Sequence, residues 1–284
     1  MKQFPSIFSE LRKEAGYTQK SLAQALNITD KAVSKWERGV SLPDISLLPK
    51  LSLLLDADIE LLLSPKANSD QWVGFIDLDD FDVDLSQLVY DKPMVYYLLS
   101  HFLLLGIRNI IFRTSERNCK YLSEDVFSRL GFSFAFDWKN LPKANVIFLN
   151  GPVFLFGSDL TRQFQGAMVA NRITKLVPAN IEPPFLFCPA EDAFMYLKNK
   201  QYLFSVANMK TLGRGMICSP MNDIDRINDI SNFVRFYQKS CGLLVGSLEE
   251  ISYRNHLIDD ETFQLLADCV LYGDELRVIF EKNK

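Results

Sequence analysis

The sequence has little of what many enzymes and membrane proteins depend on. It holds two histidines and five widely spaced cysteines without a CxxC pair, so neither a nucleophilic triad, a disulfide framework nor a zinc site is indicated. Its longest apolar run, residues 94–107, is too short to span a bilayer, and no apolar run follows Lys2 to suggest a signal peptide. These absences predict a cytoplasmic protein. We expect His101 to be a hydrogen-bonded core residue and His256 to cap a helix end.

The composition otherwise suits an ordinary globular chain. Its 284 residues are 48% apolar and 23% charged, which allows a sizeable core and two domains. The net charge of −4 argues against a protein that coats nucleic acid without selectivity. Residues 1–50, however, hold eight Lys/Arg against five Asp/Glu. A small basic module is therefore expected within an acidic chain.

Residues 1–66 follow short helical periods with tight turns and without strand-like alternation. Gly16 and Gly39 are expected to end the first and third helices. Thr18 and Thr29 are expected to cap the second and third helices, because their hydroxyl groups can accept from free backbone N–H groups. This pattern predicts an all-α domain.

The third of these helices has two different faces. Val33 and Trp36 point inward. The opposite face is polar and basic and carries Lys31, Ser34, Lys35 and Arg38. A short helix of this kind, held by a tight turn against its predecessor, fits a DNA major groove. The plainer alternative is a helical bundle with a solvated basic face.

Residues 11–63 resemble the phage-repressor (Cro-like) helix-turn-helix family over that whole stretch. The resemblance rests on Gln19, Ala23, the SKWERG run, Pro43 and the leucine-rich fourth helix. It implies binding to double-stranded DNA, with base-edge contacts from Thr29, Asp30, Lys31, Ser34 and Lys35. It implies phosphate contacts from Gln19, Lys20 and Arg38. Asp30 departs from the family pattern, and either accepts from a cytosine amino group or caps the helix.

An aspartate-rich segment follows. Seven aspartates lie between Asp70 and Asp91 without a single Lys or Arg among them. The spacing is similar to the start of a calcium loop, but Leu85 replaces the glycine that the turn needs and Asp91 replaces the final glutamate. The run FIDLDDF is also similar to the opening motif of haloacid-dehalogenase phosphatases, with Phe81 in place of the expected residue. We expect a solvated loop between a strand and a helix.

From residue 72 onward, continuous apolar runs alternate with helical periods. Strands are expected at 72–76, 108–112, 132–136, 145–149, 173–177, 185–187 and 215–218. Helices are expected from Pro93, near 120–130 and at 159–171, with one after 187 and three more at the C-terminal end. This alternation predicts an α/β domain with a mostly parallel, Rossmann-like sheet covered on both faces.

The segment YDKPMVYYLLSHFLLLGIRNIIF resembles the sugar-1-phosphate nucleotidylyltransferases, and most closely the glucose-1-phosphate thymidylyltransferases. The resemblance resumes at VIFLNGPVFLFGSDL and FLFCPAEDAFMYLKN, and it is strongest from Leu212 to Leu276. It implies a nucleotidyltransferase-like fold over residues 72–284. In that family, Mg²⁺ and a lysine neutralise the charge that spreads over the reacting phosphoryl oxygens.

The catalytic residues of that family do not carry over. Its glycine-rich loop is replaced by an acidic loop without glycine after Gly74. Its catalytic lysine falls on Asp84, and its two metal-binding aspartates fall on Gly151 and Pro220. The segment 160–185 is too short for the sugar-binding insert, whose Glu-Lys-Pro triplet is echoed by Glu182-Pro183. Nothing ionisable stands at the strand end NGP, residues 150–152. We therefore expect no catalytic residues, no metal site, no cofactor and no enzyme activity.

Thymidylyltransferases also carry a regulatory nucleotide site. The positions that match it are Phe156, Gly157, Ser158, Ser247, Glu250 and Arg254. An aromatic ring, a glycine backbone and a Glu–Arg pair spaced i, i+4 can hold a base and a diphosphate. The resemblance thus implies a nucleotide-sugar effector such as a dTDP-sugar. In the alternative interpretation, Glu250 and Arg254 are an exposed helix pair and Phe156 belongs to the core.

Together these features predict a transcriptional regulator with a helix-turn-helix domain (1–66), a linker (67–71) and a degenerate nucleotidyltransferase-like domain (72–284). A homodimer or higher symmetric oligomer is expected, because one module contacts too few base pairs. Two alternatives remain: an active nucleotidylyltransferase with an appended DNA-binding domain, and a structural dimerisation domain without a ligand. No membrane partner is expected.

Overall fold

The chain divides into two compact units, Met1–Asn68 and Ser69–Lys284. The computed structural model describes residues 4–55, 71–157, 160–168, 172–178, 182, 184–213 and 216–283. The predicted linker 67–71 lies outside these residues except for Gln71. Ser158 and residues 58–63, the end of the helix-turn-helix resemblance, also lie outside them. Each unit is described by itself below.

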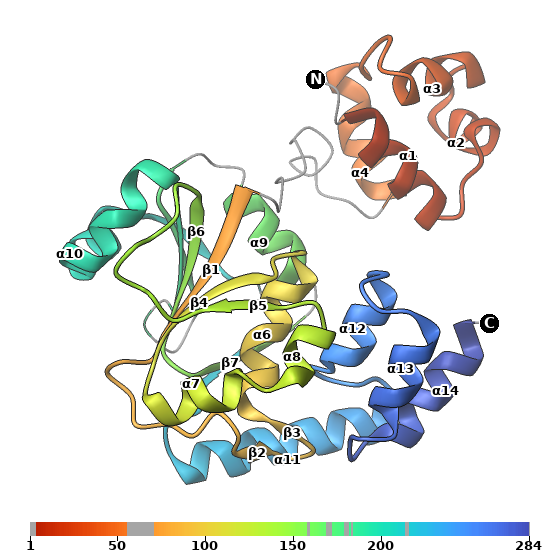
Figure 1. Cartoon of the computed structure of the whole chain (residues 1–284). Helices are drawn as coiled ribbons and strands as arrows, with labels where there is room; N and C mark the ends of the chain where they lie inside the picture. Colours follow the sequence, from red (N-terminus) through yellow and green to blue (C-terminus); the bar gives the residue numbers. More distant parts are fainter. Residues whose placement is uncertain are drawn as a thin grey trace. The chain divides into compact units, whose positions relative to one another are not determined.

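The first unit is all-helical in the part that the structure describes, residues 4–55 (Figure 1). Its elements are α1 (Phe4–Glu14), α2 (Gln19–Leu26), α3 (Asp30–Glu37), the 3₁₀ turn η1 (Ile45–Leu47) and α4 (Leu48–Leu54). The side chain of Thr18 accepts from the backbone N–H of Ser21, and that of Thr29 accepts from Ala32, so both predicted caps are confirmed. Gly16 ends α1 with a φ of +75°, a conformation that favours glycine.

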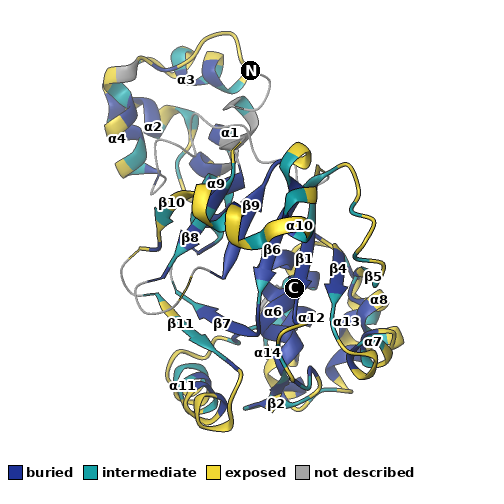
Figure 2. Cartoon of the chain, turned by 90° about the vertical axis from the view of Figure 1, so that its left-hand side faces the viewer, coloured by how far each residue is buried: buried dark blue, intermediate teal, exposed yellow. Residues whose placement is uncertain are grey.

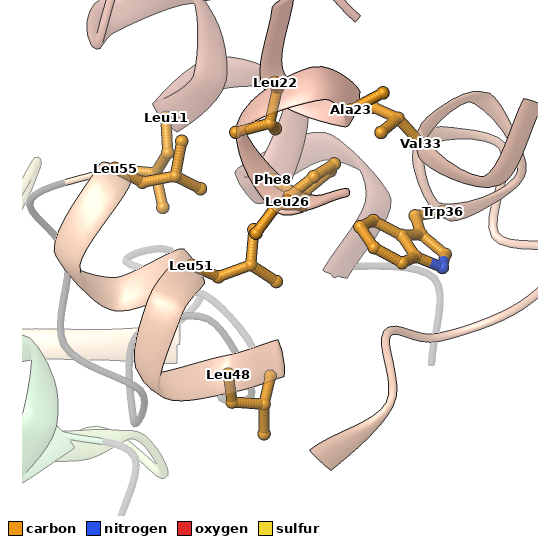
Figure 3. Close-up of a cluster of buried hydrophobic side chains, with 10 residues drawn as sticks. All are labelled: Phe8, Leu11, Leu22, Ala23, Leu26, Val33, Trp36, Leu48, Leu51 and Leu55. Carbon is orange, nitrogen blue, oxygen red and sulfur yellow. The ribbon is translucent and has the colours of Figure 1, made fainter. Parts of the chain in front are cut away.

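The core of this unit comes from every α-helix within residues 4–55. Val33 and Trp36 of α3 are buried, as predicted, and the Trp36 ring meets the ring of Phe8 edge-on at 5.7 Å. Figure 3 shows how leucines of α2 and α4 complete the cluster. Because the apolar side of α3 is packed into this core, its polar and basic side is left facing solvent.

A polar clamp joins α1 to α3. Arg12, which is 8% exposed, donates from Nε to Oε1 of Glu37 at 2.6 Å and from Nη1 to the backbone oxygen of Tyr17. Gln19 donates its side-chain amide to Oε2 of the same carboxylate. Burial alone would raise the pKa of Glu37, but the hydrogen bonds from Arg12 and Gln19 outweigh it and hold the pKa below its ordinary value. The clamp orients α3 against the helices before it.

The second unit is built on a seven-stranded sheet of order β10-β8-β9-β6-β1-β4-β5. The strands are β1 (Trp72–Asp77), β4 (Asn109–Arg113), β5 (Ser133–Ala135), β6 (Asn145–Asn150), β8 (Thr174–Val177), β9 (Phe185–Cys188) and β10 (Asn208–Thr211). All neighbours run parallel except β9, which is antiparallel to both β6 and β8. The predicted mostly parallel sheet is confirmed.

Helices cover both faces of this sheet (Figure 1). Helix α10 (Ala190–Val206) packs on one face against the side chains of Phe75, Phe148 and Leu186. The other face meets α6 (Met94–Leu104) and α9 (Leu160–Met168), with the rings of His101 and Phe164 close to Phe185. In Figure 2 the central strands are dark blue and the outer side of α10 is yellow. No helix in the described parts of the chain combines the length and apolar character that a membrane crossing needs.

The remaining elements lie outside the sheet. The short strands pair antiparallel as β7 (Val153–Phe156) with β11 (Ile217–Pro220), and β2 (Leu88–Val89) with β3 (Lys92–Pro93). The other helices are α7 (Glu116–Leu122), α8 (Asp125–Arg129), α11 (Ile224–Cys241), α12 (Leu248–Arg254), α13 (Asp260–Ala267) and α14 (Gly273–Asn283).

Three sequence expectations about these elements were wrong. The helix near 120–130 is two helices, because the backbone leaves the helical conformation at Glu124. The strand expected at 215–218 is the later β11, and it pairs with β7 instead of joining the sheet. Four helices, not three, follow β11 in the described residues, since Gly242 ends α11 in a left-handed conformation and Ser247 and Asp259 each cap a further helix.

Candidate functional site

The predicted DNA-contacting face of α3 is accessible. Lys31, Lys35 and Arg38 are exposed and Ser34 is half-buried, so four predicted side chains share one free surface. Arg38 also donates from Nε to the backbone oxygen of Ser34 at 3.2 Å, which holds the guanidinium close to the helix. The face offers cationic and hydroxyl groups to a duplex.

The start of α3 and the start of α2 contribute the other predicted contacts. Thr29 and Asp30 are exposed, and Oδ1 of Asp30 accepts from the backbone N–H of Lys31. This bond favours the capping interpretation of Asp30, although its second oxygen is left for a base. Lys20 is exposed, whereas Gln19 is half-buried and tied to Glu37. The phosphate contact of Gln19 stays a prediction, to be made with its remaining polar atoms.

A shallow hollow brings several of these residues together. Gln19, Lys20 and Asp30 line it with Arg12 and Lys13 of α1. Sequence reasoning missed Lys13, which is exposed and carries a further positive charge to this surface. Its position at the end of α1, next to a predicted phosphate-binding segment, is the signal that could have found it.

A charged cluster occupies the carboxyl ends of the central strands. Asp77, Arg113 and Asn150 are register partners on β1, β4 and β6. Asp77 is 1% exposed and accepts from the hydroxyl of Tyr196 on α10 at 3.0 Å. Residues 150–152 at the end of β6 carry nothing ionisable, as noted from the sequence, but the neighbouring strands β1 and β4 place charged groups beside them.

Two cations neutralise the acids of this cluster. Nζ of Lys200 lies 2.8 Å from Oδ2 of Asp80, 3.2 Å from Oδ1 of Asn150 and 3.7 Å from Asp77. Arg113 pairs with Asp79 and lies 3.8 Å from Asp77. The hydrogen bond from Lys200 lowers the pKa of Asp80. The aspartate segment is a largely exposed loop, as the sequence predicted, but Asp79 and Asp80 in it are ion-paired and Asp77 at its start is buried.

The positions that match the catalytic residues are filled differently. Gly151 has a φ of +90°, and a Cβ built on it would meet Cζ of Phe81 at 2.8 Å, so the ring covers this position. Pro220 pairs with Val153 in the β7–β11 ladder. Asp84 accepts from the backbone N–H and hydroxyl of Ser86, and these bonds lower its pKa. In the described parts of the chain, no group of His, Cys, Asp or Glu is placed to hold a metal ion.

The predicted effector residues converge on one pocket of about 510 Å³. Five of the six lie in the described residues, and all five line this pocket: Phe156, Gly157, Ser247, Glu250 and Arg254. Phe156 ends β7 and Gly157 follows it, Ser247 caps α12, and Glu250 and Arg254 belong to α12 itself. Ser158 lies outside the described residues. The sequence resemblance thus identified residues that the fold brings together from segments about 90 positions apart.

The pocket combines an apolar wall with charged groups. Leu104, Phe154 and Ile251 belong to its lining. Arg254 donates from Nε to Oε1 of Glu250 at 2.8 Å, as the i, i+4 spacing predicted. Burial raises the pKa of Glu250, and the Arg254 guanidinium partly offsets this effect. Such a lining suits a ligand with an apolar or aromatic part and an anionic part.

Buried hydrogen bonds hold α12 in place beside the pocket. Glu249, which is 0% exposed, accepts from the hydroxyl of Tyr96 at 2.9 Å and from the hydroxyls of Tyr272 and Ser247. Because Glu249 points into this network, its neighbour Glu250 is left to face the pocket. Sequence reasoning did not single out Glu249, since an exposed and a buried glutamate look alike in a helical pattern.

Two further lining residues were not predicted as ligand contacts. Arg162 of α9 adds a second guanidinium to the lining. His101 of α6 also lines it and is buried as predicted, but neither ring nitrogen has a hydrogen-bond partner in the described part of the chain. The expectation of a hydrogen-bonded core histidine was therefore wrong.

The first unit contains a helix-turn-helix domain. Residues 8–62 match the family described as Helix-turn-helix. The HTH-type transcriptional regulator ImmR of Bacillus subtilis is 44% identical over 54 residues, which are 19% of this chain and 42% of that regulator. The predicted class of the N-terminal domain is confirmed, and the match spans less than half of ImmR.

The second unit has a sugar nucleotidyltransferase-like fold. Glucose-1-phosphate thymidylyltransferase of Mycobacterium tuberculosis, in two strains, is 23% identical over 261 residues, covering 69% of this chain and 91% of that protein. A solved structure described as glucose-1-phosphate thymidylyltransferase of Bacillus anthracis, in complex with sucrose, is 11% identical with a TM-score of 0.44. It covers 58% of this chain and 95% of that one. The predicted α/β fold class is confirmed by the mostly parallel sheet and the helices that cover it.

Proposed function

We propose that the protein is a sequence-specific transcriptional regulator whose nucleotidyltransferase-like domain binds a nucleotide sugar without turning it over. The convergence of five predicted effector residues on one pocket carries this proposal. In this proposal, ligand binding in the pocket changes how the helix-turn-helix domain binds DNA. A dTDP-sugar is the ligand class that the resemblance to thymidylyltransferases favours.

The recognition side of the proposal rests on α3. Lys31 and Lys35 are exposed on a helix whose other face is fixed in the core, so their positions relative to a major groove are set by the fold. Thr29, Asp30 and Ser34 complete the set proposed to reach base edges. Lys20 and Arg38 are proposed to contact phosphates and to set the register on the duplex.

The ligand side rests on the size and chemistry of the pocket. Its volume of about 510 Å³ lies in the range of ordinary small-molecule sites. The guanidinium groups of Arg162 and Arg254 bring positive charge to the pocket, and Arg254 donates to Glu250 from Nε, so its Nη groups can turn to phosphate oxygens. The apolar wall around Phe154 and Phe156 is suited to a base or a sugar ring.

Inactivity is supported by the edge of the sheet. A triphosphate needs cations and backbone N–H groups there, whereas Lys200 and Arg113 are already paired with aspartates. A metal-binding carboxylate at 151 would need the space that Phe81 occupies. These contacts argue for a cleft that is closed by its own side chains.

Calorimetric titration of the full chain with dTDP-rhamnose, dTDP-glucose, UDP-glucose and dTTP tests the ligand. We expect at least one to bind, and Arg254→Ala to weaken that binding. Arg277→Ala is the matched control, because Arg277 is similarly exposed and ion-paired but lies on α14, outside the pocket. Absence of binding by all four ligands would leave the domain a structural dimeriser.

A pyrophosphate-release assay with Mg²⁺, glucose 1-phosphate and dTTP or UTP tests inactivity. We expect no turnover above a blank without protein. Release of pyrophosphate in proportion to protein concentration would establish the alternative, an active nucleotidylyltransferase with a DNA-binding domain.

A further inference from the structure

His101 is placed unusually for a buried polar side chain. It lies on α6, is 5% exposed, and neither Nδ1 nor Nε2 has a hydrogen-bond partner in the described residues. The rings of Phe185 and Phe164 pack against the imidazole at centroid distances of 5.8 and 6.2 Å. Buried polar atoms almost always have a hydrogen-bond partner in folded proteins. A partner is therefore expected for the two ring nitrogens of His101.

The surrounding pocket shows where such a partner can come from. His101 lines the same pocket as Glu250 and Arg254. The side chains of Arg254 and Glu250 are 55% and 14% exposed, so exposure falls from the guanidinium at the rim to the imidazole in the floor. A ligand anchored by its anionic end at the rim would direct its other end toward His101.

The charge state of the ring limits which end of a ligand it can receive. Burial lowers the pKa of His101 to about 4, so the ring is neutral near pH 7. A neutral imidazole offers one N–H donor and one acceptor nitrogen. That pair complements the edge of a nucleobase, which presents donors and acceptors side by side, better than it complements a phosphate, which only accepts.

We propose that His101 is the specificity residue in the floor of the pocket, hydrogen-bonding the nucleobase of a nucleotide whose phosphates lie at the Arg254 rim. This inference rests on the proposed ligand pocket and adds the orientation of the ligand within it. His101 supplies a buried polar contact in this lining, and ligands without a base forgo that contact.

Titration with dTDP and with inorganic pyrophosphate separates the two ends of the ligand. We expect His101→Leu to weaken dTDP binding about tenfold, the effect of one lost hydrogen bond, and to leave pyrophosphate binding unchanged. His101→Gln, which keeps a donor and an acceptor, should retain part of the dTDP affinity. His256→Leu is the control, because it removes the other histidine, which does not line this pocket.

Thermal unfolding and nitrogen-15 NMR distinguish this role from a structural one. The melting temperature of His101→Leu should not fall, since leucine removes an unpaired polar group. With two histidines in the chain, ring-nitrogen signals assigned by the His256→Leu variant should shift for His101 when dTDP is added.

The outcomes separate the two proposals. If dTDP binds the wild type but the His101 signals stay in place, or His101→Leu binds equally well, the role of His101 is refuted and the pocket stands. Equal weakening of pyrophosphate binding would place His101 at the anionic end and also refute it. If neither dTDP nor any nucleotide sugar binds the wild type, the proposed function fails and this inference with it.

Discussion

His101 should make the stability of the second unit depend on pH in a predictable direction. Its pKa is about 4 in the folded chain and about 6.5 when exposed, so the unfolded chain binds the proton more readily. The contribution of His101 to the free energy of unfolding keeps its full value above pH 6.5. It falls by up to about 3 kcal/mol as the pH drops from 6.5 toward 4. Denaturant unfolding of the wild type and of His101→Leu over this range measures it. Parallel pH profiles for the two proteins would contradict the assignment.

Single residues show where sequence reasoning stops. Thr18 and Thr29 were predicted as caps because capping depends on neighbours three positions away. The missing partners of His101 could not be predicted, since they depend on which groups α9, α12 and the sheet bring near it. For the same reason Asp77 was grouped with solvated aspartates, although β4, β6 and α10 surround it.

At the scale of elements, α10 packs on one face of the sheet and also supplies Tyr196 and Lys200 to the charged cluster at the strand ends. The helix is interrupted at Asn199, whose φ of −158° and ψ of 81° are not helical and whose side chain accepts from the N–H of Tyr202. Lys200 follows at once and reaches Asp80, Asn150 and Asp77. The kink thus places one cation over the ends of two strands.

Removing that cation should destabilise the second unit. Lys200→Met leaves Asp80 and the buried Asp77 with one cation fewer, at a cost of about 1–3 kcal/mol. Lys198→Met is the matched control on the same helix, because Lys198 is exposed and its Nζ lies over the ring of Phe194. Denaturant unfolding followed by circular dichroism compares them. Equal midpoints for the two variants would show that the network adds nothing to stability.

Two lysines of the first unit should affect DNA binding in different ways. Lys35→Ala, on the predicted recognition face, should weaken binding to a selected site more than to random duplex, because it removes a proposed base contact. Lys20→Ala should weaken both alike and reduce the slope of log affinity against log salt by about 0.9, as one lost phosphate contact does. Fluorescence anisotropy on duplexes enriched from a random pool measures both. If Lys20→Ala weakened mainly the binding to the selected site and Lys35→Ala weakened both kinds of binding alike, the two proposed contacts would have to be exchanged.

Element prediction succeeded where the pattern is local and failed where it is not. Continuous apolar runs identified the central strands β1, β4 and β6, because strands buried on both faces carry few polar residues. The place of β11 beside β7 is a long-range pairing that no local pattern reveals. The pocket residues were found through family resemblance and not through periodicity.

At the scale of the whole molecule, the chain should act on DNA as a symmetric assembly. One helix-turn-helix domain reads few base pairs, so paired domains are expected to occupy two half-sites roughly 34 Å apart, one turn of the duplex. Sedimentation at micromolar concentration should give a dimer or a higher symmetric oligomer, and footprinting should give two protected half-sites. A monomer that protects a single half-site with full affinity would contradict the prediction.

Phe81 and Gly151 have a consequence for the history of this sheet edge. Aspartate at 151 would need both a left-handed backbone and the space taken by the aromatic ring, so Gly151→Asp is disfavoured while Phe81 stays in place. A smaller residue at 81 would have to come first, and that step alone exposes apolar surface and restores no carboxylate. Any lineage that placed a carboxylate at 151 would therefore need two changes in order, first a smaller residue at 81 and then aspartate at 151.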